Sequence, residues 1–142
     1  MTEKVLLVDD EEDFLEAMSE RMRARGADVT TAASADEAFE TIDREDFDAV
    51  VLDFQMPGMD GFEALKKIKA KHPEMQIILL TGYATVQKGV EAIKLGATDF
   101  LEKPADMEVL FEKIKKAKAE KMLVVGKDQE KSVLKMIKKF GF

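Results

Sequence analysis

Short apolar runs alternate with helix-length segments along most of this chain. Five such runs, the last one weaker than the others, occupy residues 5–8, 29–32, 49–52, 77–80 and 99–102. Because their apolar residues are nearly continuous, these runs predict strands that are buried on both faces. Strands that alternate with helices in this way predict a doubly wound α/β domain built on a five-stranded parallel sheet.

The segments between the runs carry apolar residues every three or four positions, the spacing of a helix with one buried face. Ser34 and Glu37 form a capping-box pattern at the start of the second helix. Gly26, Pro73 and Gly96 are expected to end the first, third and fourth helices. The expected core residues of the five helices are Phe14, Leu15, Met18 and Met22; Ala38, Phe39 and Ile42; Phe62, Leu65 and Ile68; Val86, Val90 and Ile93; and Met107, Leu110, Phe111, Ile114 and Ala117.

A segment that such a domain does not need follows residue 120. We therefore divide the chain into a domain over residues 1–120 and a basic amphipathic tail over residues 121–142. Six lysines and two acidic residues give the tail a charge of +4; the whole chain carries −7, so the domain carries −11. Three interpretations of the tail stay open: it continues the fifth helix or packs back on the domain, it binds a partner or a second copy, or it lies on an anionic membrane.

Composition narrows the class of protein. A length of 142 residues, 46% of them hydrophobic and 36% charged, fits one globular domain. Cysteine is absent, which excludes disulfides and thiolate metal sites. No signal peptide or membrane-spanning run is visible, so a cytoplasmic location is expected. The acidic domain disfavours direct binding to nucleic acid.

Acidic side chains stand where two predicted strands end. Asp9 and Asp10 follow the first run, and Asp53 follows the third. The carboxyl ends of parallel strands meet at one edge of the sheet, where ligands bind. Two carboxylates about 5 Å apart repel each other by roughly 3 kcal/mol at an effective dielectric of about 20, so three together call for a cation. Each aspartate alone is more often an ordinary loop residue, but the set predicts a Mg²⁺ site.

Two further residues stand at the same predicted edge. The Thr81 hydroxyl can hydrogen-bond a phosphoryl oxygen, and the Lys103 ammonium can act as a point charge on phosphate. Taken singly, Thr81 with Gly82 is more often a simple turn, and Lys103 an ordinary solvated lysine.

These elements together carry a family resemblance. The chain resembles a bacterial response-regulator receiver domain, the phosphoacceptor module of two-component signalling, and residues 81–86 and 92–97 resemble its nitrogen-regulatory class. The resemblance implies a flavodoxin-like (βα)5 fold with strand order 2-1-3-4-5. The matching motifs are Val8-Asp9-Asp10, Leu52-Asp53, Met56-Pro57-Gly58-Met59-Asp60-Gly61, Leu80-Thr81-Gly82 and Phe100-Leu101-Glu102-Lys103-Pro104.

The resemblance implies a role for each matched position. Asp53 is the expected phosphoacceptor. Asp9, Asp10, Asp53 and the backbone carbonyl of Gln55 are expected to hold Mg²⁺. Thr81 and Lys103 are expected to contact the phosphoryl group, and Phe100 is the expected switch aromatic. Gln55 and Tyr83 are expected to modulate hydrolysis. The Lys103-Pro104 peptide bond is expected to be cis.

The predicted function is that of a phosphorylation-dependent signalling switch. A sensor histidine kinase or phosphotransfer protein supplies the phosphoryl group, and the face formed by helix 4, strand 5 and helix 5 responds. That face or the tail is expected to contact a downstream protein or a second copy. Weak autophosphatase activity is expected, but no other enzymatic activity. The alternatives are a receiver fragment of a longer transcription regulator, a scaffold that never uses phosphate, and an aspartyl-nucleophile phosphohydrolase. The last is disfavoured because such enzymes carry a second acidic residue two positions after the nucleophile, where this chain has Gln55.

Overall fold

The centre of the protein is a parallel sheet with the strand order β2-β1-β3-β6-β7. The computed structural model describes the backbone of residues 2–140 and the side chains of residues 2–126, 134, 137 and 138. Apart from the small antiparallel hairpin of β4 and β5, this order is the predicted 2-1-3-4-5, so the doubly wound fold is confirmed. The strands are β1 (Lys4–Val8), β2 (Asp28–Ala32), β3 (Ala49–Asp53), β4 (Gln55–Met56), β5 (Met59–Asp60), β6 (Ile77–Thr81) and β7 (Asp99–Glu102).

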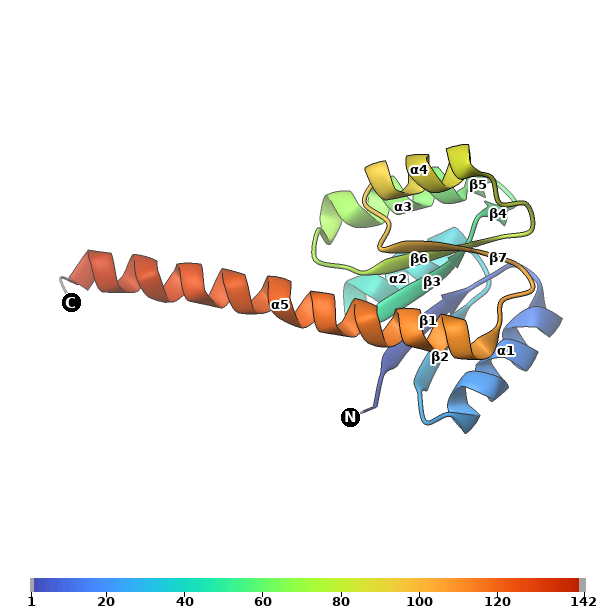
Figure 1. Ribbon diagram of the computed structural model, residues 1–142, viewed down its shortest axis with the longest axis horizontal. Coiled ribbons are helices and arrows are strands. Elements are labelled where there is room, and N and C mark those ends of the chain that lie inside the picture. Colours follow the sequence, from blue (N-terminus) through green and yellow to red (C-terminus); the bar gives the residue numbers. More distant parts are fainter. Residues whose placement is uncertain (1, 141–142) are drawn as a thin grey trace.

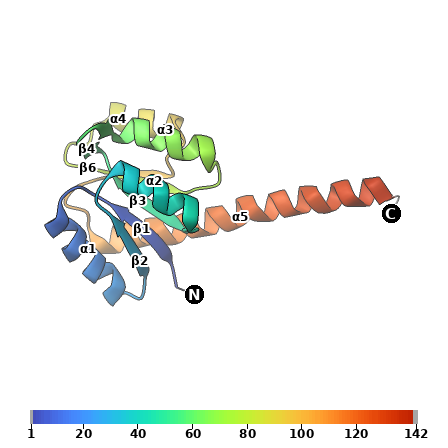
Figure 2. The ribbon, with the colours of Figure 1, turned by 180° about the vertical axis from the view of Figure 1, so that it is seen from behind.

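Helices cover both faces of the sheet (Figures 1 and 2). In β1, Leu6 and Val8 belong to the core beneath α2, α3 and α4, whereas Val5 and Leu7 belong to the core beneath α1 and α5. Successive strand residues point to opposite faces, so a sheet covered on both sides needs apolar residues at every position. The helices are α1 (Glu12–Ala24), α2 (Ala35–Arg44), α3 (Gly61–Lys71), α4 (Val86–Lys94) and α5 (Met107–Phe140).

The local signals at helix ends hold in the structure. The Ser34 hydroxyl accepts a hydrogen bond from the Glu37 backbone amide at 3.1 Å, as the capping-box pattern predicts. The Glu37 carboxylate in turn accepts from the backbone amide of Ala33 at 3.1 Å. Gly26 and Gly96, which follow α1 and α4, have φ angles of +91° and +103°, values that favour glycine.

The prediction for the buried face of α4 is wrong. Val86, Val90 and Ile93 were expected in the core, but they are 86%, 48% and 52% exposed. Ala92 is the buried residue of this helix, and Gly89 faces Phe100, whose Cδ1 would lie 3.5 Å from a Cβ added at Gly89. Small residues let α4 approach the sheet closely, so its large apolar residues lie on the outer side and form an exposed apolar surface.

The tail continues α5 as one helix that projects beyond the domain (Figures 1 and 2). Gly126 does not interrupt it. Lys121 is the last described side chain of α5 that is buried; its Nζ donates to the Phe47 carbonyl at 2.6 Å and to Asp46 Oδ1 at 2.5 Å. Described apolar side chains beyond it are exposed, at positions Met122, Leu123, Val124, Val125, Leu134 and Ile137.

Candidate functional site

The predicted aspartates meet at the carboxyl edge of the sheet. Asp9 follows β1 and Asp53 ends the adjacent strand β3, so the strand pairing brings them together. Asp9, Asp10 and Asp53 each offer a carboxylate oxygen, and these oxygens lie within 4.8 Å of one another. Asp9 is fully buried and Asp53 is 6% exposed, whereas Asp10 lies on the surface. The three aspartates therefore form an acidic cluster that solvent reaches at Asp10.

Lys103 lies over this acidic cluster. Its Nζ donates to Asp9 Oδ2 at 2.7 Å and lies 3.2 Å from Asp53 Oδ1. Its backbone amide donates to the Thr81 carbonyl at 2.7 Å, and its peptide bond to Pro104 is cis. The lysine side chain is 18% exposed, so its charge acts in a partly dehydrated setting. A cation in this position can neutralise the cluster and contact a group bound on Asp53.

The pKa values of Asp53 and Lys103 are both shifted by their surroundings in the cluster. Burial, followed by the negative charge of Asp9, raises the pKa of Asp53 from 3.8 to about 6, although Lys103 and the Gln55 amide oppose the shift. Burial lowers the pKa of Lys103, but its hydrogen bond to Asp9 and the charges of both aspartates outweigh burial and leave that pKa raised. A buried, repelled carboxylate beside a firmly protonated lysine is typical of a functional site.

Thr81 faces its own loop in this conformation. It is 2% exposed, and its hydroxyl accepts from the Tyr83 amide at 3.2 Å and donates to the Tyr83 carbonyl at 3.4 Å. The Tyr83 side chain is 71% exposed. Lys88 Nζ also donates to the Tyr83 carbonyl, at 3.1 Å. Engagement of Thr81 with a group on Asp53 therefore requires the Thr81–Tyr83 hydrogen bonds to rearrange.

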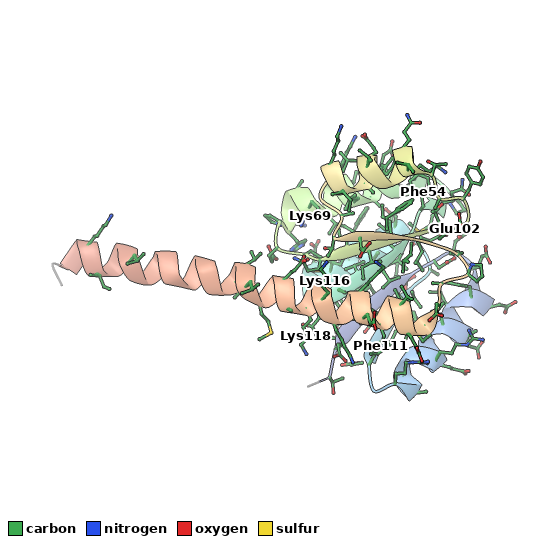
Figure 3. The ribbon with its side chains drawn as sticks, in the orientation of Figure 1. Phe54, Lys69, Glu102, Phe111, Lys116 and Lys118 are labelled. Atoms are coloured by element: carbon green, nitrogen blue, oxygen red, sulfur yellow. The ribbon has the colours of Figure 1, made fainter. Side chains whose placement is uncertain are left out.

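Glu102 belongs to one of the matching motifs, but no role was predicted for it. Its Oε2 accepts from the Ala84 backbone amide at 2.8 Å and so ties the end of β7 to the loop that follows Thr81. Glu102 and Phe54 lie at the end of the sheet opposite the projecting part of α5 (Figure 3). No local pattern could reveal this contact, because Ala84 lies in the loop after β6 whereas Glu102 ends β7. Phe100, the expected switch aromatic, is half-buried on β7 beside α4.

The loop after Asp53 depends on a close backbone approach. The amide of Gly61 donates to the Phe54 carbonyl at 2.6 Å, and a Cβ added at Gly61 would lie 2.7 Å from Phe54 Cα. Asp60 caps α3 by accepting from the Glu63 amide at 2.8 Å. These contacts and the pairing of β4 with β5 hold the segment that carries Gln55, the second residue after Asp53. Whether the Gln55 carbonyl binds a metal stays a prediction.

The donor set fits magnesium. Mg²⁺ prefers oxygen ligands and retains several waters, and the partly open cluster of three carboxylates offers both ligands and solvent access. The residues that would hold the ion are Asp9, Asp10 and Asp53. A bound Mg²⁺ would neutralise carboxylate repulsion and orient phosphoryl oxygens.

Magnesium is expected to raise the melting temperature of the protein, because it binds the folded cluster and relieves repulsion among the carboxylates. At a free concentration of about 100 times its Kd, the ion would add about 2.7 kcal/mol to the free energy of unfolding. Thermal unfolding with MgCl₂, against NaCl of equal ionic strength, measures the effect. Asp10→Ala should lose the response, and Asp13→Ala, an exposed acid of α1, should keep it. An undiminished response in Asp10→Ala would contradict the assignment.

Comparison with known proteins agrees with this geometry. The family model described as response regulator receiver domain matches residues 5–115. The chain is 38% identical over 112 residues to the response regulator protein FleR of Pseudomonas aeruginosa, an alignment that covers 79% of this chain and 24% of FleR. It is 37% identical over 115 residues to the transcriptional regulatory protein ZraR of Escherichia coli K12, with 81% and 26% covered.

A solved structure shows the same fold. The beryllofluoride-activated NtrC4 receiver domain dimer matches with a TM-score of 0.78 and 38% identity, over 83% of this chain and 98% of that one. The chain spans about a quarter of the length of the two curated relatives. Because ZraR is named a transcriptional regulator, the expectation that this protein avoids nucleic acid gains no support from its relatives.

Proposed function

The chain belongs to the response regulator receiver domain family, and we propose that Asp53 is the residue on which it accepts a phosphoryl group. Receiver domains of this family are phosphoryl-accepting switches of two-component systems. The observation that carries the assignment is the position of Asp53: it is 6% exposed, within reach of Asp9 and Asp10, and 3.2 Å from the Lys103 ammonium.

The proposed transfer requires little covalent help from the protein. The P–N bond of a phosphohistidine donor breaks while a carboxylate oxygen of Asp53 forms the new P–O bond, and the electron pair of the broken bond stays on the imidazole. Catalysis then depends on positioning and on neutralising charge. Lys103 would shift its contact from Asp9 toward the phosphoryl oxygens, and Asp9 and Asp10 would share the metal. Slow hydrolysis of the acyl phosphate would reset the switch.

The conformational response would begin at Thr81. To donate to a phosphoryl oxygen, its hydroxyl must leave the Tyr83 carbonyl, which would loosen the loop that Glu102 and Lys88 also hold. Phe100 lies beside Gly89 of α4, and its rotation would alter the exposed surface of α4. Phosphorylation would shift the protein from one loop arrangement to the other. The size of this shift would depend on how much more the phosphoryl group stabilises the second arrangement than the first.

Phosphoryl uptake tests the assignment. The protein is incubated with Mg²⁺ and acetyl phosphate, and its intact mass is followed beside that of Asp53→Asn. Wild type should gain one phosphoryl group that the variant lacks, and the mimic beryllofluoride should change the spectra of wild type only. A protein that gains no adduct and ignores the mimic would instead support the scaffold interpretation. Uptake by both proteins would move the phosphoacceptor to another residue.

The exposed apolar surface of α4 is the proposed output contact. Tyr83, Val86, Val90 and Ile93 are all at least 48% exposed, which is unusual for so many large apolar side chains near one helix. The proposed occupants are a downstream protein or a second copy, and the projecting part of α5 offers a further contact. In the part of the chain that the structure describes, no helix combines the length and apolarity needed to cross a membrane.

Removing residues 122–142 is expected to leave the fold and phosphoryl uptake intact, because Lys121 is the last buried residue among the side chains of α5 that the structure describes. Removing residues 121–142 should lower the melting temperature, since the Phe47 carbonyl loses its lysine donor. Thermal unfolding of the two truncated proteins and of the full chain measures the difference. Equal melting temperatures for the two truncations would contradict the role of Lys121. A full chain that sediments as a dimer, beside two truncated proteins that sediment as monomers, would place a self-contact in the tail.

A further inference from the structure

The ring of Phe14 lies against the ammonium of Lys103. The Nζ of Lys103 is 4.3 Å from the ring centroid, within the distance at which the negative face of an aromatic ring attracts a cation. Of the cation–ring contacts among the described residues, this is the shortest, and it alone uses a lysine that also bonds the acidic cluster. Lys103 therefore has three neighbours: Asp9, Asp53 and an aromatic face.

The backbone of α1 holds the ring in place. Phe14 lies in the first turn of α1, and the residues that anchor this helix, Leu15, Met18 and Met22, are at most 7% exposed. Phe14 itself is half-buried and packs beside the core under α1 and α5. The ring is thus presented by a rigid element, whereas Lys103 reaches it on a flexible four-carbon chain.

An aromatic face suits a lysine that must change partners. A carboxylate would hold the ammonium more strongly, but it would also compete with an incoming phosphoryl group. The ring has no ionised acceptor, so it restrains the ammonium and leaves its charge available. Because the Lys103 side chain is only 18% exposed, the attraction is less weakened by water than at the surface.

We propose that Phe14 is a positioning residue for phosphoryl transfer, whose ring holds the Lys103 ammonium over Asp53 before and during phosphoryl uptake. The proposal rests on the proposed function of Asp53. Plain packing is the competing explanation: Phe14 would then serve only as an apolar residue of α1, and a leucine would replace it without loss. The two explanations differ in whether the aromatic face matters.

Phe14→Leu and Phe14→Tyr separate the two explanations, since both keep an apolar body and only tyrosine keeps the ring. The rate of phosphoryl uptake from acetyl phosphate is measured at saturating Mg²⁺. Phe14→Leu should be about five- to tenfold slower than wild type, whereas Phe14→Tyr should stay within about twofold. The proposal is overturned if Leu and Tyr behave alike.

A double-mutant comparison locates the effect at Lys103. In a Lys103→Ala background, Phe14→Leu should cause no further slowing, and an equal slowing in both backgrounds would overturn the proposal. Ring-current shifts of the Lys103 ε-methylene protons provide a readout that does not need phosphate. They should be present in wild type and Phe14→Tyr and absent in Phe14→Leu. If wild type takes up no phosphoryl group, the proposed function fails, while these shifts still test the contact.

Discussion

Asp53→Asn is expected to stabilise the magnesium-free protein at about pH 7, at the same time as it abolishes phosphoryl uptake. Burial and the charge of Asp9 raise the pKa of Asp53 to about 6, so the folded protein holds the charged form at a cost. A shift from 3.8 to about 6 corresponds to about 3 kcal/mol, which solvent screening at the open edge reduces to about 1–2 kcal/mol. Asparagine removes this cost because it carries no charge.

The sign determines the expected pH profile. A carboxyl whose pKa is raised by folding contributes its full stability below its unfolded pKa of 3.8 and loses it as pH rises through about 6. Urea unfolding in a chelating buffer should therefore show wild type losing stability over this window relative to Asp53→Asn. Asp43→Asn is the control of opposite sign, because hydrogen bonds from Lys71 and His72 lower the pKa of Asp43. An Asp53→Asn protein less stable than wild type at pH 7 would contradict the electrostatic account.

The fold was predictable because its local and global requirements coincide. Runs such as Val5–Val8 and Ile77–Leu80 are apolar throughout since both faces of these strands are covered. The same logic fails on α4, where apolar residues at helical spacing are exposed. Val86 and Val90 have helical spacing but lie on the outer side, because Gly89 and Ala92 face the sheet. Spacing identifies an apolar face; it does not say which partner covers that face.

The site was predictable only where the chain places residues at strand ends. Asp9, Asp53 and Lys103 could be expected at one edge from strand topology alone. Glu102 and Phe14 could not, since their contacts join separate elements: Glu102 bonds the Ala84 amide, and Phe14 lies against Lys103. Phe14 has the spacing of a core residue, which concealed its contact with the charged cluster.

Gly61→Ala is expected to disrupt the site without touching any charged residue. A Cβ at this position would lie 2.7 Å from Phe54 Cα and 3.1 Å from the Phe54 carbonyl oxygen. Both atoms belong to the backbone, so no side-chain rotation can relieve the clash, and either α3 or the segment after Asp53 must move. Overpacking of this kind costs about 1–3 kcal/mol and occasionally more, so the free energy of unfolding should fall by about that amount.

The displaced segment carries Phe54 and Gln55, the residues directly after Asp53, so the variant should also bind Mg²⁺ less tightly than wild type. Gly82→Ala is the matched control for stability, since a Cβ there meets nothing within 4 Å and Gly82 has no positive φ. Urea unfolding should show a loss in Gly61→Ala and a change within about 0.5 kcal/mol in Gly82→Ala. If Gly61→Ala kept wild-type stability, α3 would be free to shift, and the close approach of Gly61 would not be what holds Gln55 beside Asp53.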